Sequence, residues 1–313
     1  MIRADANKII GTGHVMRTSV IAEELISRGQ EVIFVGMFSK ILWLKTRIEH
    51  LGFSRIIADE KKFISNPKTD ILILDSYTLL VDNEFIQPMN WYSIVSIFDI
   101  STPNYASNLI IHPSIVTGWK PKTKTNFLTG PNYIPLRNSI TKSLNNDSGS
   151  DVLQILVVGG GTDSLNFVHA ILEVLKVMPQ NFNVSLFTDR ISIEQLDSRF
   201  SVFSLGSHLD VKAKNCDLVF TTASTSGLEF IAREIPLGIG CAVDNQKYTY
   251  ESLTNLKIAF PIGQYILDKW NLDAESIHQL IKNQHLRQTL KSRCKDLIDL
   301  KGTKRIADKI LTL

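Results

Sequence analysis

Apolar and polar positions alternate along the chain in two distinct periods. In the first half, short apolar runs typical of buried strands occupy residues 1–4, 31–35, 56–57, 70–74, 92–98 and 109–111. Between them, residues 12–28 and 40–50 carry apolar side chains at helical spacing. Gly29 and Gly52 follow these two segments, where a glycine often ends a helix. The pattern predicts strands that alternate with helices.

The same alternation restarts after a polar stretch, residues 144–151, with the sequence LNNDSGSD. Strands are predicted at residues 152–158, 183–187, 202–205, 218–221 and 237–240, and helices at residues 164–177, 227–233, 274–282 and 304–313. Strands alternating with helices in both halves indicate an α/β protein with two doubly wound parallel sheets. We therefore expect an N-terminal domain at residues 1–144, a linker at residues 145–150 and a C-terminal domain at residues 151–313, with a last helix that can cross back.

Composition narrows the class of protein. The chain has 313 residues, of which 44% are hydrophobic and 21% are charged, an ordinary balance for globular domains. A net charge of +3 is too small to indicate nucleic acid, but it suits an anionic small molecule. Three scattered cysteines indicate neither a disulfide framework nor a zinc site. With no signal-peptide pattern and no apolar run of the roughly 18 residues that span a bilayer, we expect a cytoplasmic monomer or weak dimer.

The first candidate site is the loop Gly11-Thr12-Gly13-His14. Ligands of open α/β sheets bind beyond the carboxyl ends of strands, and this loop follows the first predicted strand. Its glycines permit a tight turn, the following helix N-terminus favours an anion, and a histidine can take a proton near neutral pH. The alternative is a structural loop in which His14 caps the helix. A dinucleotide fingerprint is excluded because Met16 stands where GxGxxG needs glycine.

Three loops of the second half suit a nucleotide. The run of glycines at residues 159–161 lies between a strand and a helix, where it can cradle phosphate, although no Walker motif follows. Residues 222–226 supply hydroxyl donors before a helix, and Glu229 can accept hydrogen bonds from ribose hydroxyls. Asn245 and Gln246 follow the next strand and can bind sugar hydroxyls or amides. The alternatives are a tight turn, a capped helix and a surface turn, respectively.

Taken in order, these motifs resemble a known family. RADANKIIGTGHVMR (residues 3–17) resembles the N-terminal signature of the UDP-2,4-diacetamido-2,4,6-trideoxy-β-L-altropyranose hydrolases of pseudaminic acid biosynthesis, which are related to the MurG-like glycosyltransferases. The resemblance continues through LDSY (74–77), GPNYIPLR (130–137), GGTD (160–163), ASTSGLE (223–229) and DNQ (244–246). It implies the GT-B fold, two Rossmann-like domains whose sheets face a cleft.

The resemblance also implies a reaction: hydrolysis of a UDP-linked amino sugar at the anomeric C–O bond, with inversion and without metal or cofactor. His14 is then the base for water, and the loops of the second domain hold UDP. Together the motifs and the resemblance predict two catalytic residues, His14 and Asp5. The predicted substrate-binding residues are Arg3, Gly11, Gly13, Arg17, Tyr77, Gly160, Gly161, Thr162, Ala223, Ser224, Thr225, Glu229, Asn245 and Gln246.

The sequence departs from the family pattern in two places, which leaves the sugar and the reaction open. The family usually has a second aspartate after Asp99, where this chain has Ile100, and usually shows Glu-Phe near the position that Asn138 and Ser139 occupy. Two alternatives follow. One is a MurG-like glycosyltransferase that uses a UDP-sugar donor and an acceptor hydroxyl in place of water. The other is a nucleotide-sugar binder without activity.

Overall fold

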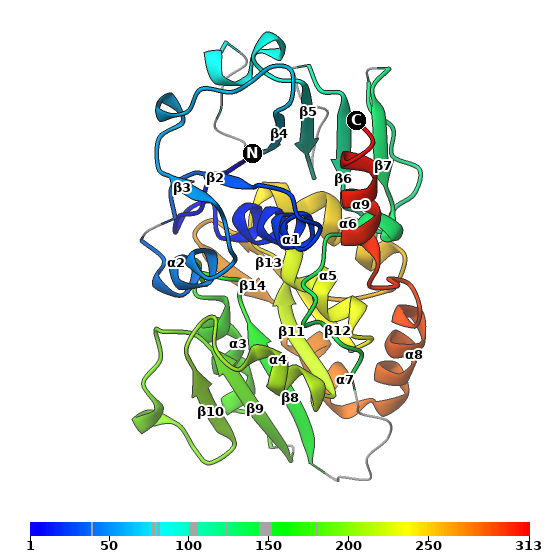
Figure 1. Ribbon diagram of the computed structural model, residues 1–313. Coiled ribbons are helices and arrows are strands. Elements are labelled where there is room, and N and C mark those ends of the chain that lie inside the picture. Colours follow the sequence, from blue (N-terminus) through cyan, green and yellow to red (C-terminus); the bar gives the residue numbers. More distant parts are fainter. Residues whose placement is uncertain are drawn as a thin grey trace. The chain divides into compact units, whose positions relative to one another are not determined.

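The chain folds into two compact units (Figure 1). The computed structural model describes residues 1–38, 40–76, 79, 82–99, 106–122, 124–143, 152–179 and 181–313. The first unit comprises Met1–Asn138 together with Leu300–Leu313, and the second comprises Ser139–Asp299. The two ends of the chain therefore belong to the same unit. The predicted linker, residues 145–150, lies outside the described residues.

A seven-stranded parallel sheet forms the centre of the first unit. Its order is β3-β2-β1-β4-β5-β6-β7, so the strand order reverses between β1 and β4. The strands are β1 (Ile2–Ala4), β2 (Ile33–Val35), β3 (Arg55–Ile57), β4 (Ile71–Asp75), β5 (Ser93–Ile97), β6 (Leu109–His112) and β7 (Asn126–Thr129). Successive side chains of a strand point to opposite faces, so the sheet needs cover on both sides.

Both faces of this sheet are covered. Apolar side chains of β1, β2, β5 and β6 share one core with the helices α1 (Gly13–Ser27), α2 (Leu42–Glu49) and α9 (Gly302–Ile310). On the other face, Leu72 and Leu74 of β4 pack with Ile86 and Trp91. Ile86 is the last residue of the short helical segment η2 (Glu84–Ile86), and Trp91 directly follows a second such segment, η3 (Pro88–Asn90). Two further such turns are η1 (Glu60–Lys62) and η4 (Pro131–Tyr133).

The second unit repeats the topology with one change. Its order is β10-β9-β8-β11-β12-β13-β14, reversing between β8 and β11. The neighbours are parallel except β13 and β14, which form an antiparallel hairpin. The strands are β8 (Leu153–Val158), β9 (Phe182–Phe187), β10 (Phe200–Phe203), β11 (Leu218–Thr222), β12 (Leu237–Cys241), β13 (Phe260–Ile266) and β14 (Lys269–Leu272).

Helices again cover this sheet. α3 (Phe167–Lys176), α7 (Ala274–Lys282) and α8 (Gln284–Cys294) share a core with β8, β9 and β11. α5 (Thr225–Ala232) packs against β11 and β12, and α6 (Lys247–Asn255) packs against β12 and β13. The remaining segments are α4 (Leu209–Lys214), η5 (Ile193–Gln195) and η6 (Asp244–Gln246).

The prediction of two parallel α/β sheets is confirmed, and the misses have physical causes. The strand β7 was not predicted because it is a short edge strand whose first and last residues, Asn126 and Thr129, are polar, so its apolar run is too short to be recognised. The β13–β14 hairpin was missed because Leu267 and Asp268 form its turn with φ of +52° and +58°, without the Asn-Gly or Asp-Gly pair that usually signals such a turn. α3 begins at Phe167 rather than at the predicted residue 164.

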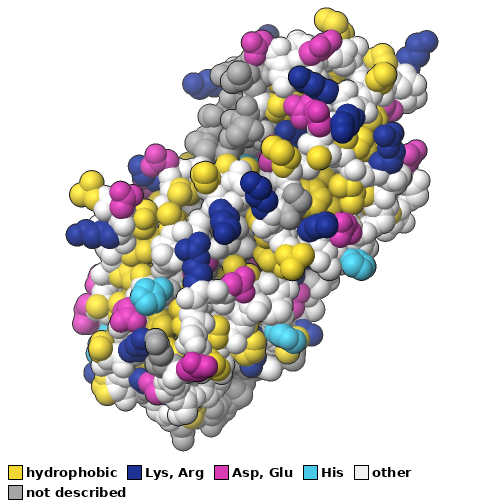
Figure 2. Space-filling model, turned by 90° about the vertical axis from the view of Figure 1, so that its left-hand side faces the viewer, with side chains coloured by type: hydrophobic (Ala, Val, Ile, Leu, Met, Phe, Trp, Pro, Cys, Tyr) yellow, Lys and Arg dark blue, Asp and Glu magenta, His cyan; other side chains and the backbone are white. Residues whose placement is uncertain are grey.

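The surface carries both signs of charge. On the face that Figure 2 draws, basic and acidic side chains are interspersed among apolar ones, in keeping with the small net charge. Within the ranges that the structure describes, no helix is both long enough and apolar enough to cross a bilayer.

Candidate active site

Each sheet has one point where its strand order reverses, and ligands of such sheets bind beyond the carboxyl ends of the strands at that point. In the first unit this point lies between β1 and β4, which lead into residues 5–13 and 76. In the second unit it lies between β8 and β11, which lead into the loops at residues 159–166 and 223–224. Three of the four candidate loops therefore follow strands on which the topology places a ligand site, and the fourth, with Asn245 and Gln246, follows the next strand, β12.

A tight turn leads from β1 to the first turn of α1. The side-chain oxygen of Asn7 accepts hydrogen bonds from the backbone N–H groups of Ile9 (2.8 Å) and Ile10 (2.9 Å). The N–H of Gly11 donates to the carbonyl of Asn7 at 2.9 Å, and Gly11 has a φ of +76°, a conformation that glycine adopts without steric cost. α1 then begins at Gly13, so this turn sets the position of His14.

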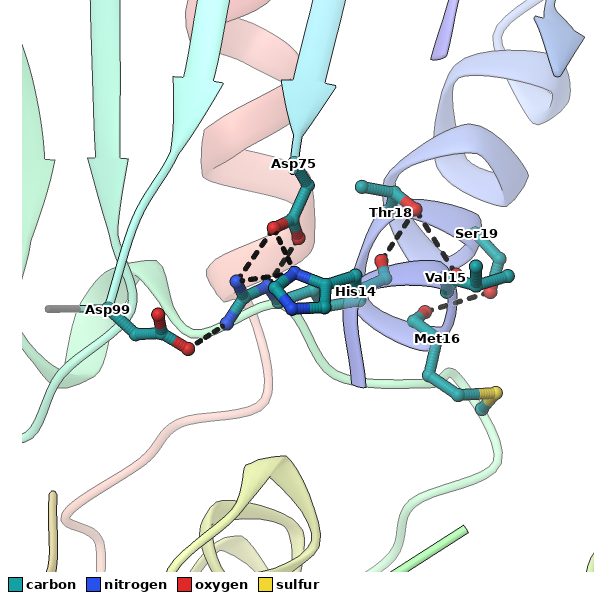
Figure 3. A network of polar contacts seen from close by, with 8 residues as sticks. His14, Val15, Met16, Thr18, Ser19, Asp75 and Asp99 are labelled. Carbon is teal, nitrogen blue, oxygen red and sulfur yellow. Dashed lines mark hydrogen bonds and ion pairs between the residues drawn. The ribbon is translucent and has the colours of Figure 1, made fainter. Parts of the chain in front are cut away.

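His14 is buried, and it binds an aspartate from the neighbouring strand rather than capping its helix. Its Nδ1 lies 2.5 Å from Oδ1 of Asp75, the last residue of β4 (Figure 3). An ionised carboxylate only accepts hydrogen bonds, so Nδ1 carries the proton and donates it. The basic atom of the ring is then Nε2. A histidine held this way by a buried carboxylate is suited to act as a general base.

Arg17 ties this pair to a second aspartate. Its Nε donates to Oδ2 of Asp75 at 2.5 Å, its Nη2 donates to Oδ1 of Asp75 at 2.8 Å, and its Nη1 donates to Oδ2 of Asp99 at 2.7 Å. Nη2 also lies 3.3 Å from Nδ1 of His14. The shorter contact with the carboxylate decides where the imidazole proton lies. One guanidinium thus contacts both aspartates and the histidine.

The charges of this cluster hold one another in their ionised forms. Burial alone would raise the pKa of Asp75, but the charges of Arg17 and His14 and their hydrogen bonds lower it to about 2. Burial likewise opposes the charge of Arg17, but the two carboxylates raise its pKa overall. Asp75 is therefore a carboxylate and Arg17 a cation at every physiological pH.

Arg3 and Asp5, two predicted site residues, form a separate cluster at the start of the same loop. Nη1 of Arg3 lies 2.7 Å from Oδ1 of Asp5, and its Nε donates to Oε2 of Glu60 at 3.2 Å. The backbone N–H of Met37 donates to Oδ1 of Asp5 at 2.8 Å. Both side chains are buried. These contacts join β1 to the segments after β2 and β3, and a catalytic role for Asp5 stays a prediction.

A second histidine lies at the carboxyl end of β6. His112 stacks on Trp119 with ring centroids 4.2 Å apart, and its Nδ1 lies 3.1 Å from the hydroxyl of Thr129. Burial lowers the pKa of His112 to about 4; the charge of Asp99 opposes this shift and that of Arg17 adds to it. His112 therefore stays neutral at physiological pH.

In the second unit, glycine residues and hydroxyl side chains lie in the loops where the strand order reverses. Gly160 has a φ of +91°, and a Cβ built on it would lie 4.0 Å from the hydroxyl of Thr222. That hydroxyl donates to Oγ of Ser224 at 3.3 Å, and Ser224 precedes the first residue of α5, Thr225. Backbone N–H groups at the start of a helix and hydroxyl donors are suited to a diphosphate. Gly161 and Thr162 lie in the first loop, and Ala223 and half-buried Glu229 belong to the second loop and α5.

One buried carboxyl group adjoins the glycine loop. Asp163 follows it with a φ of +43°, and a Cβ built on Gly159 would lie 2.0 Å from its Oδ1. Its carboxyl oxygens accept long hydrogen bonds of 3.4 Å from the N–H of Val168 and the hydroxyl of Thr188. Burial raises the pKa of Asp163 to about 6.

The predicted amide side chains lie in η6 after β12. Oε1 of Gln246 accepts a hydrogen bond from the N–H of Ala242 at 3.1 Å, so it stabilises its own loop. Oδ1 of Asn245 is buried and has no hydrogen-bond partner among the residues that the structure describes. Tyr77, another predicted site residue, lies outside the described residues. Across the described ranges, no group of three or more His, Cys, Asp or Glu side chains is arranged to hold a metal ion.

The site contains two residues that stand at predicted strand ends in the sequence, although the sequence analysis gave them no catalytic or binding role. Asp75 and Asp99 each end or follow a strand, which is where ligand-binding residues of such sheets lie. Their partner Arg17 is three residues after His14 and so shares its helix face. These two signals together point to the cluster, but pairing across 58 and 82 residues becomes visible only in the fold.

Comparison of the sequence with known proteins finds an uncharacterized relative. No protein-family model matches the chain. Over 280 residues, 80% of the chain, it is 26% identical to the uncharacterized protein MJ1062 of Methanocaldococcus jannaschii. This match spans 57% of the archaeal protein, so the chain corresponds to little more than half of that relative.

Solved structures match over the whole chain. MurG of Acinetobacter baumannii has a TM-score of 0.68 and 13% identity, covering 100% of this chain and 99% of MurG. The calicheamicin glycosyltransferase CalG4 has a TM-score of 0.66, 12% identity and coverages of 99% and 97%. The chain has the GT-B fold. UGT89C1 of Arabidopsis thaliana, solved with UDP, matches this fold with a TM-score of 0.66, 12% identity and coverages of 99% and 98%. The predicted GT-B fold is thus confirmed.

Proposed function

We propose that this protein is an enzyme that cleaves the bond between the anomeric carbon of a nucleotide-linked sugar and its diphosphate, with His14 as the general base. The observation that carries the proposal is the 2.5 Å contact between Nδ1 of His14 and the buried carboxylate of Asp75. This contact orients the imidazole and stabilises the imidazolium that forms when Nε2 takes a proton. The fold supports the same class, because MurG, CalG4 and UGT89C1 share it.

The proposed step balances as a displacement. An incoming O–H group gives its proton to Nε2 of His14 while its oxygen forms a bond to the anomeric carbon. The bond from that carbon to the diphosphate oxygen breaks, and its electron pair leaves with the diphosphate. Attack from the face opposite the leaving group inverts the anomeric configuration. We assign the diphosphate to the glycine and hydroxyl loops of the second unit, where helix N-termini can stabilise its charge.

Transfer to an acceptor hydroxyl is the reaction that the comparisons favour. CalG4 is described as a glycosyltransferase, as are the spinosyn rhamnosyltransferase SpnG, solved with thymidine diphosphate, and the spinosyn forosaminyltransferase SpnP. Each shares only the fold with this chain, with identities of 9–12%. Transfer would need an alcohol acceptor in place of water.

Hydrolysis is the second candidate, and one observation favours it. Residues 3–17, RADANKIIGTGHVMR, resemble the signature of the UDP-sugar hydrolases of pseudaminic acid biosynthesis. The loop therefore supports water as the nucleophile, with an amino sugar as the substrate. The two reactions differ only in the oxygen that His14 would activate, since base, donor and leaving group are the same.

The test is a panel of UDP- and dTDP-linked sugars, with UDP-linked amino sugars included, incubated with and without simple alcohol and sugar acceptors. Phosphorus NMR reports release of the nucleoside diphosphate, and proton NMR reports the configuration of the sugar product. Release that needs an acceptor supports transfer, and release in water with a free sugar supports hydrolysis. Absence of release under both conditions, with the nucleotide bound, would overturn the proposal.

A further inference from the structure

We infer that Asp99 is a positioning residue for His14: it acts through Arg17, whose guanidinium it holds in the orientation that fixes Asp75 and the imidazole. The inference rests on the proposed function for its meaning in catalysis. The arrangement of the four side chains stands on geometry alone, so it can be tested without a substrate.

The contacts form a chain with Arg17 at its centre. Asp99 accepts from Nη1 at 2.7 Å, while Nε and Nη2 form a two-point pair with the two oxygens of Asp75. A guanidinium is planar and rigid, so anchoring its third nitrogen fixes the plane of the other two. Asp75 in turn holds Nδ1 of His14. Figure 3 shows His14 and Asp75 close together, with Asp99 projecting toward them from the other side.

Burial separates the roles of the two aspartates. The side chain of Asp75 is 0% exposed, whereas that of Asp99 is 23% exposed. Asp75 contacts the imidazole directly, whereas Asp99 contacts Arg17, whose guanidinium contacts both Asp75 and the imidazole. Asp99 can therefore be changed without leaving an unpaired charge deep in the core, which makes it the informative residue of the cluster.

Asp99 also affects the net charge of the cluster, and through it the protonation of the imidazole. With a neutral imidazole, the cluster contains one cation, Arg17, and two carboxylates, so its net charge is −1. Proton uptake by His14 brings this to zero. Without the Asp99 charge, the same proton would take a buried cluster from zero to +1, which is unfavourable in a medium of low dielectric. His112, which also interacts with Arg17 and Asp99, adds no charge at physiological pH because burial lowers its pKa to about 4.

A purely structural role is the alternative. Asp99 would then only neutralise Arg17, and its loss would lower stability without changing the imidazole. The two roles differ in what they predict for the imidazole tautomer and for the pH dependence of turnover, neither of which a loss of stability alone would move.

The first measurement needs no substrate. The full chain carrying isotope-labelled histidine is examined by NMR, with His14→Gln used to assign the ring of His14. In the wild type we expect the neutral ring to carry its proton on Nδ1. In Asp99→Asn we expect a mixture with the Nε2–H tautomer, and in Asp99→Glu a partial return to the wild-type state. Asp308→Asn is the matched control, because it removes one of the two carboxylates that pair with Arg28 at the opposite end of α1.

The second measurement uses whichever nucleotide sugar the panel identifies. For Asp99→Asn we expect kcat to fall about tenfold, with KM and UDP affinity within about threefold of wild type. We expect the acid limb of the kcat profile to move to lower pH, since losing a negative charge disfavours the imidazolium. Thermal unfolding of all variants is recorded alongside.

An imidazole of Asp99→Asn that keeps the wild-type tautomer in a folded protein would overturn the inference. So would a loss of UDP binding that parallels the loss of kcat, since it would place Asp99 in substrate binding. If the wild type turns over no member of the panel, the proposed function fails, but the tautomer measurement still decides whether Asp99 positions His14.

Discussion

Each unit buries an aspartate near the carboxyl ends of its central strands. The pKa of one is lowered from the ordinary value, and the pKa of the other is raised. Asp75 in the first unit contacts a guanidinium and an imidazole, and its pKa is lowered to about 2. Asp163 in the second unit accepts hydrogen bonds from backbone N–H groups and a hydroxyl but contacts no cation among the residues that the structure describes, and burial raises its pKa to about 6. The same residue type in the same topology thus has a lowered pKa in one unit and a raised pKa in the other.

The difference matches the chemistry that each loop set can perform. A fixed carboxylate supports a histidine that gains positive charge as it takes a proton. A carboxyl group with a raised pKa beside the glycine loop could take up a proton when an anionic ligand binds there, because the charge of the ligand would disfavour the carboxylate. In the proposed reaction, similar sheets would therefore serve different parts of the chemistry through the few side chains at their carboxyl ends.

The largest expected effect is on the base of the first unit. His14→Ala removes the group that takes the proton, and we expect kcat to fall by about a thousandfold or more, with UDP affinity within about threefold of wild type. Kinetics on the active nucleotide sugar and calorimetry with UDP measure the two quantities. His50→Ala, an exposed histidine after α2, is the control. A His14→Ala enzyme within tenfold of wild type would remove His14 from the mechanism.

The second-largest expected effect is that of removing the negative charge of Asp75. Asp75→Asn keeps the shape of the side chain but presents an amide where Arg17 and His14 need a carboxylate. We expect kcat to fall about a hundredfold to a thousandfold, and the free energy of unfolding to fall by about 3 kcal/mol because Arg17 loses a buried partner. Urea titration and kinetics test both, against Asp308→Asn. Unchanged stability would show that the cluster reorganises around the amide.

The glycine loop of the second unit should respond in binding rather than in turnover. Gly160→Ala puts a Cβ on a residue whose φ is +91°, so the loop must shift. We expect UDP affinity to fall about tenfold, with kcat at saturating donor close to wild type. Gly29→Ala is the matched control, since Gly29 has a φ of +79° and, like Gly160, room for the new atom. Equal UDP affinities in both variants would take the loop out of nucleotide binding.

The smallest expected effect concerns the buried carboxyl group of Asp163. Asp163 binds its proton more tightly in the fold than its ordinary pKa of 3.8 allows in the unfolded chain. Its contribution to stability is therefore fully present below that value and is lost as the pH rises through about 6. At pH 8, Asp163→Asn should raise the free energy of unfolding by on the order of 2 kcal/mol, and below pH 4 the gain should vanish.

Urea titrations of the wild type, Asp163→Asn and the exposed control Asp189→Asn across this pH range measure the effect. A gain that is the same at both ends of the range would mean that packing, not ionisation, distinguishes the amide from the acid at position 163.

Much of the fold could be predicted from local patterns. Buried parallel strands such as β4 and β8 read as continuous apolar runs, and Gly29, with its φ of +79°, ends the first helix as its position in the sequence indicates. What escaped prediction has little local signal: β7 is short and contains polar residues, and the β13–β14 turn uses Leu267 where glycine or asparagine is usual.

The site was only partly predictable for a different reason. The turn at Gly11 and the histidine after it are signals within a few residues of one another. The partners of His14 come from β4 and the end of β5, so their identity depends on which strands become neighbours. The sequence offered Arg17 as a ligand for the substrate, and the fold shows its guanidinium engaged by two carboxylates.

The return of α9 to the first unit has a consequence for how the chain is made. α9 packs against α1 and η4, and Arg28 near the end of α1 pairs with Asp308. A ribosome releases α9 only after the whole of the second unit has emerged. The second unit can therefore reach its native state while the first still waits for its closing helix with part of its core uncovered. Translation order thus allows the second unit to fold first, whereas the first unit, which contains His14, can complete its core only after residues 300–313 have emerged.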